Sequence, residues 1–134
     1  MKVEHITPLL IVDTIEPLLP MWRDSLGYKV VAEVGEDPSS DNPSQPLGFV
    51  ILSRDDQTLM LQSKASIEKD IPAVGKLGVT SLLYINVDNL DAHMTAMGDA
   101  TLLVGPRTTF YGAKEAFFVT RSGHVVAFAE HAAG

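Results

Sequence analysis

The chain has 134 residues, 46% of them hydrophobic, and a formal net charge of −7 at pH 7. This length suits one compact domain, and the acidic balance argues against nucleic-acid binding, which needs basic surface. There is no cysteine for disulfides or thiolate chemistry. Without a signal-peptide pattern or an apolar run of roughly 20 residues, we expect a cytoplasmic protein with neither a nucleic-acid nor a membrane partner.

The first half predicts a strand, a helix and a second strand. Residues 4–12 are rich in β-branched and aliphatic types, as strands are. Asp13 and Thr14 can cap a helix that runs to about Leu26, and Pro20 predicts an irregular first turn. Gly27 supplies the left-handed residue that ends a helix, and residues 28–33 form the next strand.

A polar loop and a hairpin complete this half. Residues 35–46 are mostly Gly, Pro, Ser, Asp and Asn, which predicts a surface loop. Residues 47–53 and 58–62 read as two strands of a hairpin around Arg54-Asp55-Asp56-Gln57. A connector follows, with one helical turn at residues 66–70 that stops before Pro72.

The second half repeats the plan. Residues 79–87 predict a strand, Asp88 or Asn89 caps a helix that ends at Gly98, and residues 101–104 form a strand. Residues 105–112 read as a loop, and residues 116–120 and 124–130 form a hairpin. We therefore divide the single domain, 1–134, into two β-α-β-β-β modules at 1–65 and 78–134, joined by a connector at 66–77. We expect an α+β fold in which both modules build one cupped mixed sheet with helices outside.

Several short motifs stand out along the chain. They are Pro8 and Val12-Asp13 before Trp22-Arg23-Asp24-Ser25-Leu26-Gly27-Tyr28, then residues 110–119, Arg121-Ser122-Gly123-His124 and Phe128-Ala129-Glu130. Together they resemble the vicinal oxygen chelate superfamily of glyoxalases, bleomycin resistance proteins and dioxygenases, and most closely its bleomycin-resistance-like branch. The resemblance spans nearly the whole chain, and it implies a cavity and a homodimer.

The resemblance also implies where a divalent metal would be bound. Ligands in this family come from the first and last strands of each module, and the corresponding positions here are Thr7, Met60, Leu82 and Ala127. None of these side chains is a good ligand for a divalent metal, which takes imidazole, carboxylate or amide oxygen. A shift of two residues recovers only His5 and Gln62. We therefore expect no cofactor, with a divalent metal as the alternative.

The apolar residues at these positions favour a cavity for organic ligands. Phe110 and Tyr111 lie in a predicted loop, where they either close the mouth of a cavity over a flat ligand or fill the core. No catalytic residue is assigned. The predicted ligand pocket consists of Thr7, Leu9, Met60, Gln62, Leu82, Tyr84, Phe110, Tyr111, Glu115 and Ala127.

Three hypotheses for function remain open. The first is a metal-free protein that binds a small organic molecule, with a cationic one as an option, as in antibiotic sequestration. The second is a metal-dependent lyase, isomerase or dioxygenase with atypical ligands such as His5, Gln62 or Glu115. The third is a structural or regulatory dimer without an open cavity.

Overall fold

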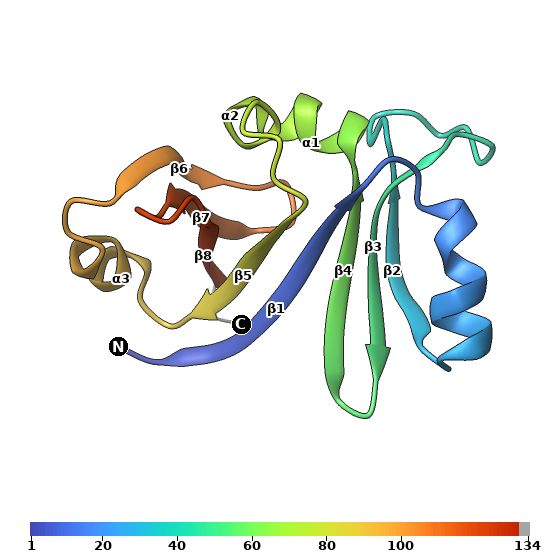
Figure 1. The fold of residues 1–134 in the computed structure, drawn as a ribbon, viewed down its shortest axis with the longest axis horizontal. Helices are drawn as coiled ribbons and strands as arrows, with labels where there is room; N and C mark the ends of the chain where they lie inside the picture. The colour runs from blue at the N-terminus through green and yellow to red at the C-terminus, as the bar shows by residue number, and fades with distance from the viewer. Residues whose placement is uncertain (132–134) are drawn as a thin grey trace. The chain divides into compact units, whose positions relative to one another are not determined.

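The computed structural model describes residues 1–131 and divides the chain into two compact units. One unit is Pro8–Thr80, and the other joins Met1–Thr7 to the chain from Ser81 onward. The predicted module boundaries at 65 and 78 remain a prediction. Figure 1 shows the course of the chain through these elements.

The unit Pro8–Thr80 contains a four-stranded mixed sheet with the strand order β2-β3-β4-β1. Strands β1 (Val3–Val12) and β4 (Gln57–Ser63) are parallel, whereas β2 (Lys29–Gly35), β3 (Leu47–Arg54) and β4 are antiparallel neighbours. One face of this sheet packs on the segment between β1 and β2. The core of that packing is Ile15, Leu19, Val50, Leu52, Leu59 and Leu61.

The segment between β1 and β2 is helical but irregular. It consists of a 3-10 turn, η1 (Glu16–Leu18), and a π-helical stretch, η2 (Pro20–Ser25). The irregularity predicted from Pro20 is present, but the predicted cap is wrong, since no side chain caps η1. Asp13 instead pairs with Lys64 at 2.8 Å. That lysine begins α1 (Lys64–Asp70), which is followed by α2 (Pro72–Gly75).

The second unit contains four strands in the order β5-β8-β7-β6. Strands β5 (Ser81–Val87) and β8 (Val125–His131) are parallel, and β6 (Thr101–Thr108) and β7 (Ala113–Val119) follow antiparallel to their neighbours. Helix α3 (Leu90–Ala96) covers one face, and its cap is as predicted, because the Asn89 side chain accepts a hydrogen bond from Ala92 N. The core beneath α3 is Val87, Leu90, Ala116, Phe118 and Phe128.

One detail of the second unit differs from the prediction, and one differs from the first unit. Strand β6 continues to Thr108, so that residues 105–108 belong to a strand rather than to a loop. The hairpin β7–β8 has one residue more than β3–β4, since Ile51 pairs with Met60 whereas Phe117 pairs with Ala127. A one-residue change of register moves a side chain to the other face of a sheet, so Phe118 lies under α3 and Phe117 on the opposite face.

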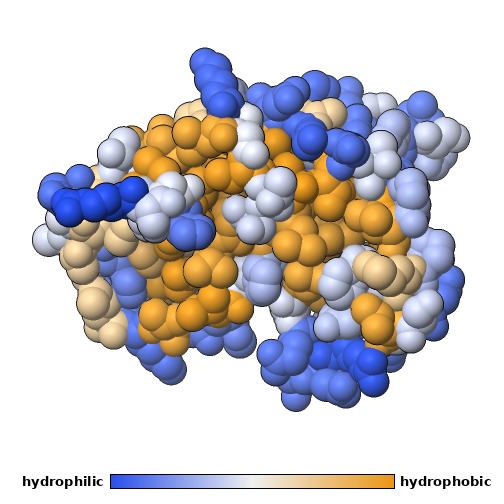
Figure 2. All heavy atoms as spheres, viewed as in Figure 1, coloured by the Kyte–Doolittle hydropathy of each residue, from blue (hydrophilic) through white to orange (hydrophobic). Residues whose placement is uncertain are grey.

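The distribution of polar and apolar side chains follows these sheets. Figure 2 shows apolar atoms gathered over the strands, and polar atoms around the β3–β4 turn. Asp55 and Asp56 occupy that turn with positive φ angles of 50° and 63°, the conformation that a two-residue hairpin turn demands. Within residues 1–131, no helix has the length and apolar character needed to cross a membrane.

Candidate functional site

The face of the second sheet that lies away from α3 carries the polar residues of interest. On this face Tyr84 of β5 pairs with Ala127 of β8, which pairs in turn with Phe117 of β7. Glu115 lies two residues before Phe117 on the same strand, and alternate residues of a strand share a face. Arg107 of β6 is paired with Glu115 in the register of the β6–β7 hairpin, which places the two side chains together.

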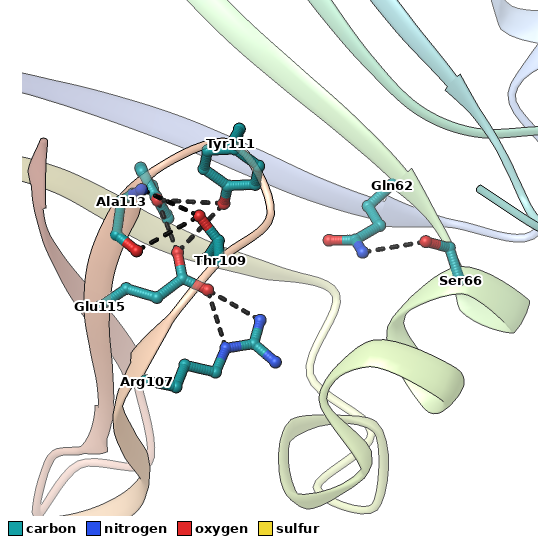
Figure 3. Close-up of polar contacts among 8 residues, drawn as sticks. Gln62, Ser66, Arg107, Thr109, Tyr111, Ala113 and Glu115 are labelled. Carbon is teal, nitrogen blue, oxygen red and sulfur yellow. Dashed lines mark hydrogen bonds and ion pairs between the residues drawn. The ribbon is translucent and has the colours of Figure 1, made fainter. Parts of the chain in front are cut away.

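Glu115 is the centre of a compact hydrogen-bonded cluster, although only 1% of it is exposed. Its Oε1 accepts bonds from Arg107 Nε at 3.0 Å and from Arg107 Nη2 at 2.7 Å. Its Oε2 accepts bonds from the Tyr84 hydroxyl at 2.6 Å and from the Tyr111 hydroxyl at 3.2 Å. Figure 3 shows Arg107 and Tyr111 converging on this carboxylate. A buried carboxylate is stable only when it is paired and bonded in this way.

The loop between β6 and β7 is closed by Thr109. Its N–H donates to the carbonyl of Ala113 at 2.7 Å, and its hydroxyl oxygen accepts the N–H of Ala113 at 3.0 Å. Gly112 has φ of +86°, a conformation that side chains rarely adopt. The closed loop presents Phe110, 81% exposed, and Tyr111, 52% exposed, with ring centroids 5.1 Å apart in an edge-to-face arrangement.

The loop aromatics therefore do not fill the core, and their expected role at the mouth of a cavity remains a prediction. A pair of large exposed aromatic side chains is unusual on a free surface, because burying each would remove a large apolar area from water. Tyr111 also has a polar anchor within the fold, since its hydroxyl bonds to Glu115. Phe110 is the more exposed of the two aromatic side chains.

The cluster keeps both tyrosines protonated. Burial, followed by the charge of Glu115, raises the pKa of Tyr84 far above its ordinary value. Burial is likewise the main cause that raises the pKa of Tyr111, with the contact to the Tyr84 hydroxyl opposing it and the nearby Glu115 acting in the same direction as burial. Each neutral phenol can then donate its proton to the carboxylate. The Arg107 guanidinium balances the charge of an ionised Glu115.

The predicted pocket residues of the unit Pro8–Thr80 lie on the face of its sheet away from η2. Leu9 pairs with Met60, and Gln62 lies two residues beyond Met60, so their side chains share this face. Leu9 is 5% exposed, and Met60 and Gln62 are each 6% exposed. Gln62 donates to Ser66 Oγ at 3.0 Å (Figure 3).

In the second unit, three predicted pocket residues meet directly, namely Tyr84, Tyr111 and Glu115. Ala127 is beside Tyr84 in the register, and Phe110 packs on Tyr111. Leu82 and Thr7 are buried at 4% and 6% exposure. The common function assigned to all ten residues remains a prediction.

The residues at the four family metal positions do not fit a divalent cation. Leu82 and Ala127 offer no donor atom, Met60 offers a soft thioether, and Thr7 offers a neutral hydroxyl. Among residues 1–131 no group of three or more His, Asp or Glu side chains is placed to hold a metal ion. Of the atypical ligands considered, Glu115 already accepts four hydrogen bonds.

Two surface hollows lie outside the predicted pocket. One of about 320 Å³ is lined by residues 99–101 and 119–121, and one of about 200 Å³ by Glu68, Pro72, Gly75 and Lys76. The first contains the ion pair of Arg121 and Asp99, at 4.0 Å with both side chains more than nine-tenths exposed. Such a pair is largely screened by water, so neither hollow offers the buried polar chemistry found at Glu115.

Sequence reasoning missed Arg107 and Thr109. Both fell in the expected loop 105–112, because Gly105 and Pro106 favour an irregular segment. A hairpin centred on Tyr111 would have revealed them, since it pairs residue 109 with 113 and residue 107 with 115. The opposite charges of Arg107 and Glu115 are the signal that supports this register.

The two units thus define a protein of paired β-α-β-β-β modules, each with a parallel pair formed by its first and last strands. A family profile described as Glyoxalase/Bleomycin resistance protein/Dioxygenase superfamily matches residues 2–128. The chain belongs to this superfamily. No curated protein sequence matches the chain.

Solved structures share the fold at low sequence identity. A glyoxalase/bleomycin resistance protein/dioxygenase superfamily member from Vibrio splendidus 12B01 is 18% identical with a TM-score of 0.67, covering 96% of this chain and 99% of that one. A hypothetical protein from Bacillus halodurans C-125 is 20% identical with a TM-score of 0.68, covering 100% and 98%.

Streptomyces coelicolor methylmalonyl-CoA epimerase, solved in complex with 2-nitronate-propionyl-CoA, is 18% identical with a TM-score of 0.67, covering 98% of this chain and 100% of that one. At such identities the likeness concerns the fold alone. Together with the strand orders, it confirms the predicted α+β class of the glyoxalase/bleomycin-resistance type.

Proposed function

We propose that this protein binds a small organic molecule without the help of a metal, and that the loop at Phe110 and Tyr111 contacts this ligand. The observation that carries the proposal is the exposed aromatic pair anchored on a buried carboxylate. Aromatic rings supply large contact areas at low entropic cost, and convergent polar groups beside an apolar surface are typical of ligand sites. Sequestration of a compound, such as an antibiotic, needs no more than this.

The donor set supports binding rather than metal-assisted catalysis. Catalytic metals in proteins are held by several imidazole or carboxylate ligands and keep a position open for substrate. Thr7, Met60, Leu82 and Ala127 cannot supply such ligands. We further propose that the protein acts in the cytoplasm as a homodimer, as the superfamily resemblance implies.

A ligand screen by thermal unfolding tests the proposal. The panel contains uncharged and cationic aromatic compounds, a bleomycin-type antibiotic among them. A ligand present at a hundredfold excess over its Kd stabilises a protein by about 2.7 kcal/mol, which corresponds to a shift of roughly 8 °C for a chain of this size. We expect at least one aromatic compound to give a shift of this order.

Two matched variants locate the site. Phe110→Ser removes the most exposed aromatic ring of the loop, and Leu102→Ser removes an apolar side chain of the same unit that is 44% exposed. We expect the first to abolish the shift and the second to leave it unchanged. Equal effects, or no shift with any compound, would refute the proposed function.

Metal analysis separates the proposal from the alternative of a metal-dependent lyase, isomerase or dioxygenase. The purified protein is titrated with Mn²⁺, Ni²⁺ and Zn²⁺ and followed by calorimetry. We expect no stoichiometric binding of micromolar affinity. A tight ion that is lost on His5→Ala or Gln62→Ala would instead favour the metal-dependent alternative.

A further inference from the structure

The four hydrogen bonds that Glu115 accepts are unequal. Both bonds to Oε1 come from Arg107, whose side chain is 27% exposed, and the shorter bond to Oε2 comes from Tyr84 at 2.6 Å. The remaining bond, from Tyr111, is the longest of the four at 3.2 Å. Its donor is also the most exposed of the three partners. Tyr111 therefore makes the weakest of the four bonds to the carboxylate.

The position of Tyr111 makes its departure compatible with the rest of the fold. Thr109 and Ala113 close the base of the loop through backbone and hydroxyl contacts that do not involve the Tyr111 ring. The bonds from Arg107 and Tyr84 to Glu115 do not depend on the Tyr111 hydroxyl.

Removal of the Tyr111 hydroxyl leaves Oε2 of Glu115 with one hydrogen-bond donor fewer. A buried carboxylate oxygen that loses a hydrogen bond pays a desolvation penalty unless another donor replaces the lost one. The group that Tyr111 presents there is an uncharged aromatic hydroxyl. A ligand with the same group would restore the bond and place its ring beside Phe110, which now packs edge-on against Tyr111 at 5.1 Å.

The charge at the cluster selects against a cation. Arg107 lies 2.7 Å from Oε1 and already balances a carboxylate charge. A protonated amine bound at Oε2 of the same carboxylate would stand within a few ångströms of that guanidinium, and the two positive charges would repel each other. A neutral hydroxyl or N–H donor causes no such repulsion.

We propose that Oε2 of Glu115 is the recognition point for the hydroxyl or N–H group of an uncharged, flat aromatic ligand, and that the Tyr111 hydroxyl occupies this point until the ligand displaces it. The inference rests on the proposed function and specifies the ligand class of that site. Tyr111 then competes with the donor group of the ligand for Oε2 of Glu115.

The test combines three small probes with wild type and the variant Tyr111→Phe. p-Cresol carries the hydroxyl, 4-methylanisole has the hydroxyl methylated, and 4-methylbenzylammonium carries a cation on the same ring. Binding is measured at pH 7 by NMR titration, from the amide signals of the loop around Gly112. Tyr28→Phe is the control variant, because it removes a hydroxyl from a tyrosine packed on Trp22 in the other unit.

We expect p-cresol to bind wild type about tenfold more tightly than either of the other two probes, on the usual strength of a hydrogen bond to a charged acceptor. Tyr111→Phe should bind p-cresol about fivefold more tightly than wild type does, because the competing hydroxyl is gone. Neither Tyr111→Phe with 4-methylanisole nor Tyr28→Phe with p-cresol should show a gain. Spectra of each variant before titration establish that the fold is intact.

Three results would overturn the inference. They are equal affinity of wild type for p-cresol and 4-methylanisole, weaker binding of p-cresol by Tyr111→Phe than by wild type, and tighter binding of the ammonium probe than of p-cresol by wild type. The proposed function has a separate outcome. A compound from the thermal screen whose effect is lost in Phe110→Ser would uphold organic-ligand binding even where donor recognition by Glu115 fails.

Discussion

Replacing Arg107 with methionine would show how strongly the buried carboxylate depends on its ion pair. The change removes two charge-assisted hydrogen bonds, at 3.0 and 2.7 Å, and leaves Glu115, 1% exposed, with two phenol donors. It also removes a guanidinium that stands 5.7 Å from the centre of the Phe117 ring. Methionine keeps much of the apolar length of the side chain, so the packing loss is small.

The expected cost follows from the burial of the pair. Breaking a fully buried ion pair by removing one partner costs about 3–5 kcal/mol. The Arg107 side chain is 27% exposed and the tyrosines continue to donate, so we expect a lower value, about 2–4 kcal/mol. Against a total stability of roughly 5–15 kcal/mol, this is a large fraction.

The assay is urea unfolding followed by circular dichroism, with Arg121→Met as the matched control. Arg121 also pairs with a carboxylate, but at 4.0 Å and with both side chains more than nine-tenths exposed. Its replacement should not separate measurably from wild type, because exposed pairs contribute little. Comparable destabilisation by the two methionine variants would refute the idea that Glu115 is held by a buried charge pair.

A second variant tests the same contact in an independent way. Glu115→Gln removes the charge with little change of shape, and the double variant then closes a mutant cycle with Arg107→Met. Groups in direct contact give coupling energies of about 0.5–3 kcal/mol. We expect a value near the upper end, and a coupling near zero would contradict the assigned contact.

Three further predictions concern stability. The pKa of Tyr84 is raised in the folded state, so the stability that its neutral phenol gives the fold is present below about pH 10 and is lost as the pH rises further. The free energy of unfolding of Tyr84→Phe should therefore fall less steeply than that of wild type above about pH 10. Parallel curves for the two proteins in alkaline urea titrations would count against this. Asn89→Ala should cost about 1 kcal/mol through the lost cap of α3, measured by urea unfolding against Asp13→Ala, which should leave stability unchanged. Leu61→Ala, at a site with 0% exposure, should cost about 2–5 kcal/mol, and a thermal midpoint equal to that of Leu102→Ala would contradict the core assignment.

Sequence reasoning about the fold succeeded at positions where local backbone hydrogen bonding and tertiary packing favour the same residue type. Asn89 was expected to cap a helix and does so, because a short polar side chain at that corner has few other uses. Asp13 stands at the corresponding corner of the first half, yet it pairs with Lys64. The two prolines that follow it and the irregular η segments change the geometry there, which a comparison of residue types cannot reveal.

The two hairpins differ in a way that residue types do not reveal. Arg54 and Arg121 are both arginines near a turn, but Arg54 ends strand β3 whereas Arg121 lies within a longer turn. Turn length sets the register of a hairpin, and register decides which face each side chain takes. Similar residues at the two turns therefore do not imply the same register. The register follows from the number of residues between Phe117 and Ala127, which pair across the turn.

The residues of the Glu115 cluster were named only in part for a comparable reason. Tyr84 lay on an expected strand and Tyr111 in an expected loop, and Glu115 was named just after that loop, whereas Arg107 was not singled out within the expected loop 105–112. A glycine and a proline in sequence suggest a loop, and only the pairing of β6 with β7 shows that the strand continues past them. Glu115 is bonded to Arg107, a cross-strand partner eight residues away, and local secondary-structure propensities do not predict such a pair.

The placement of Glu115 also bears on the proposal that this protein binds its ligand without a metal. Ala127 offers no donor, but Tyr84 is its neighbour in the register and Glu115 bonds to that tyrosine at 2.6 Å. The polar chemistry of this sheet face is thus offset by one strand from the position where the family places a ligand. A carboxylate with its charge balanced by Arg107 binds donors by hydrogen bonding rather than binding cations by charge, and this difference is why a neutral ring, and not a metal or an amine, is the ligand class to test first.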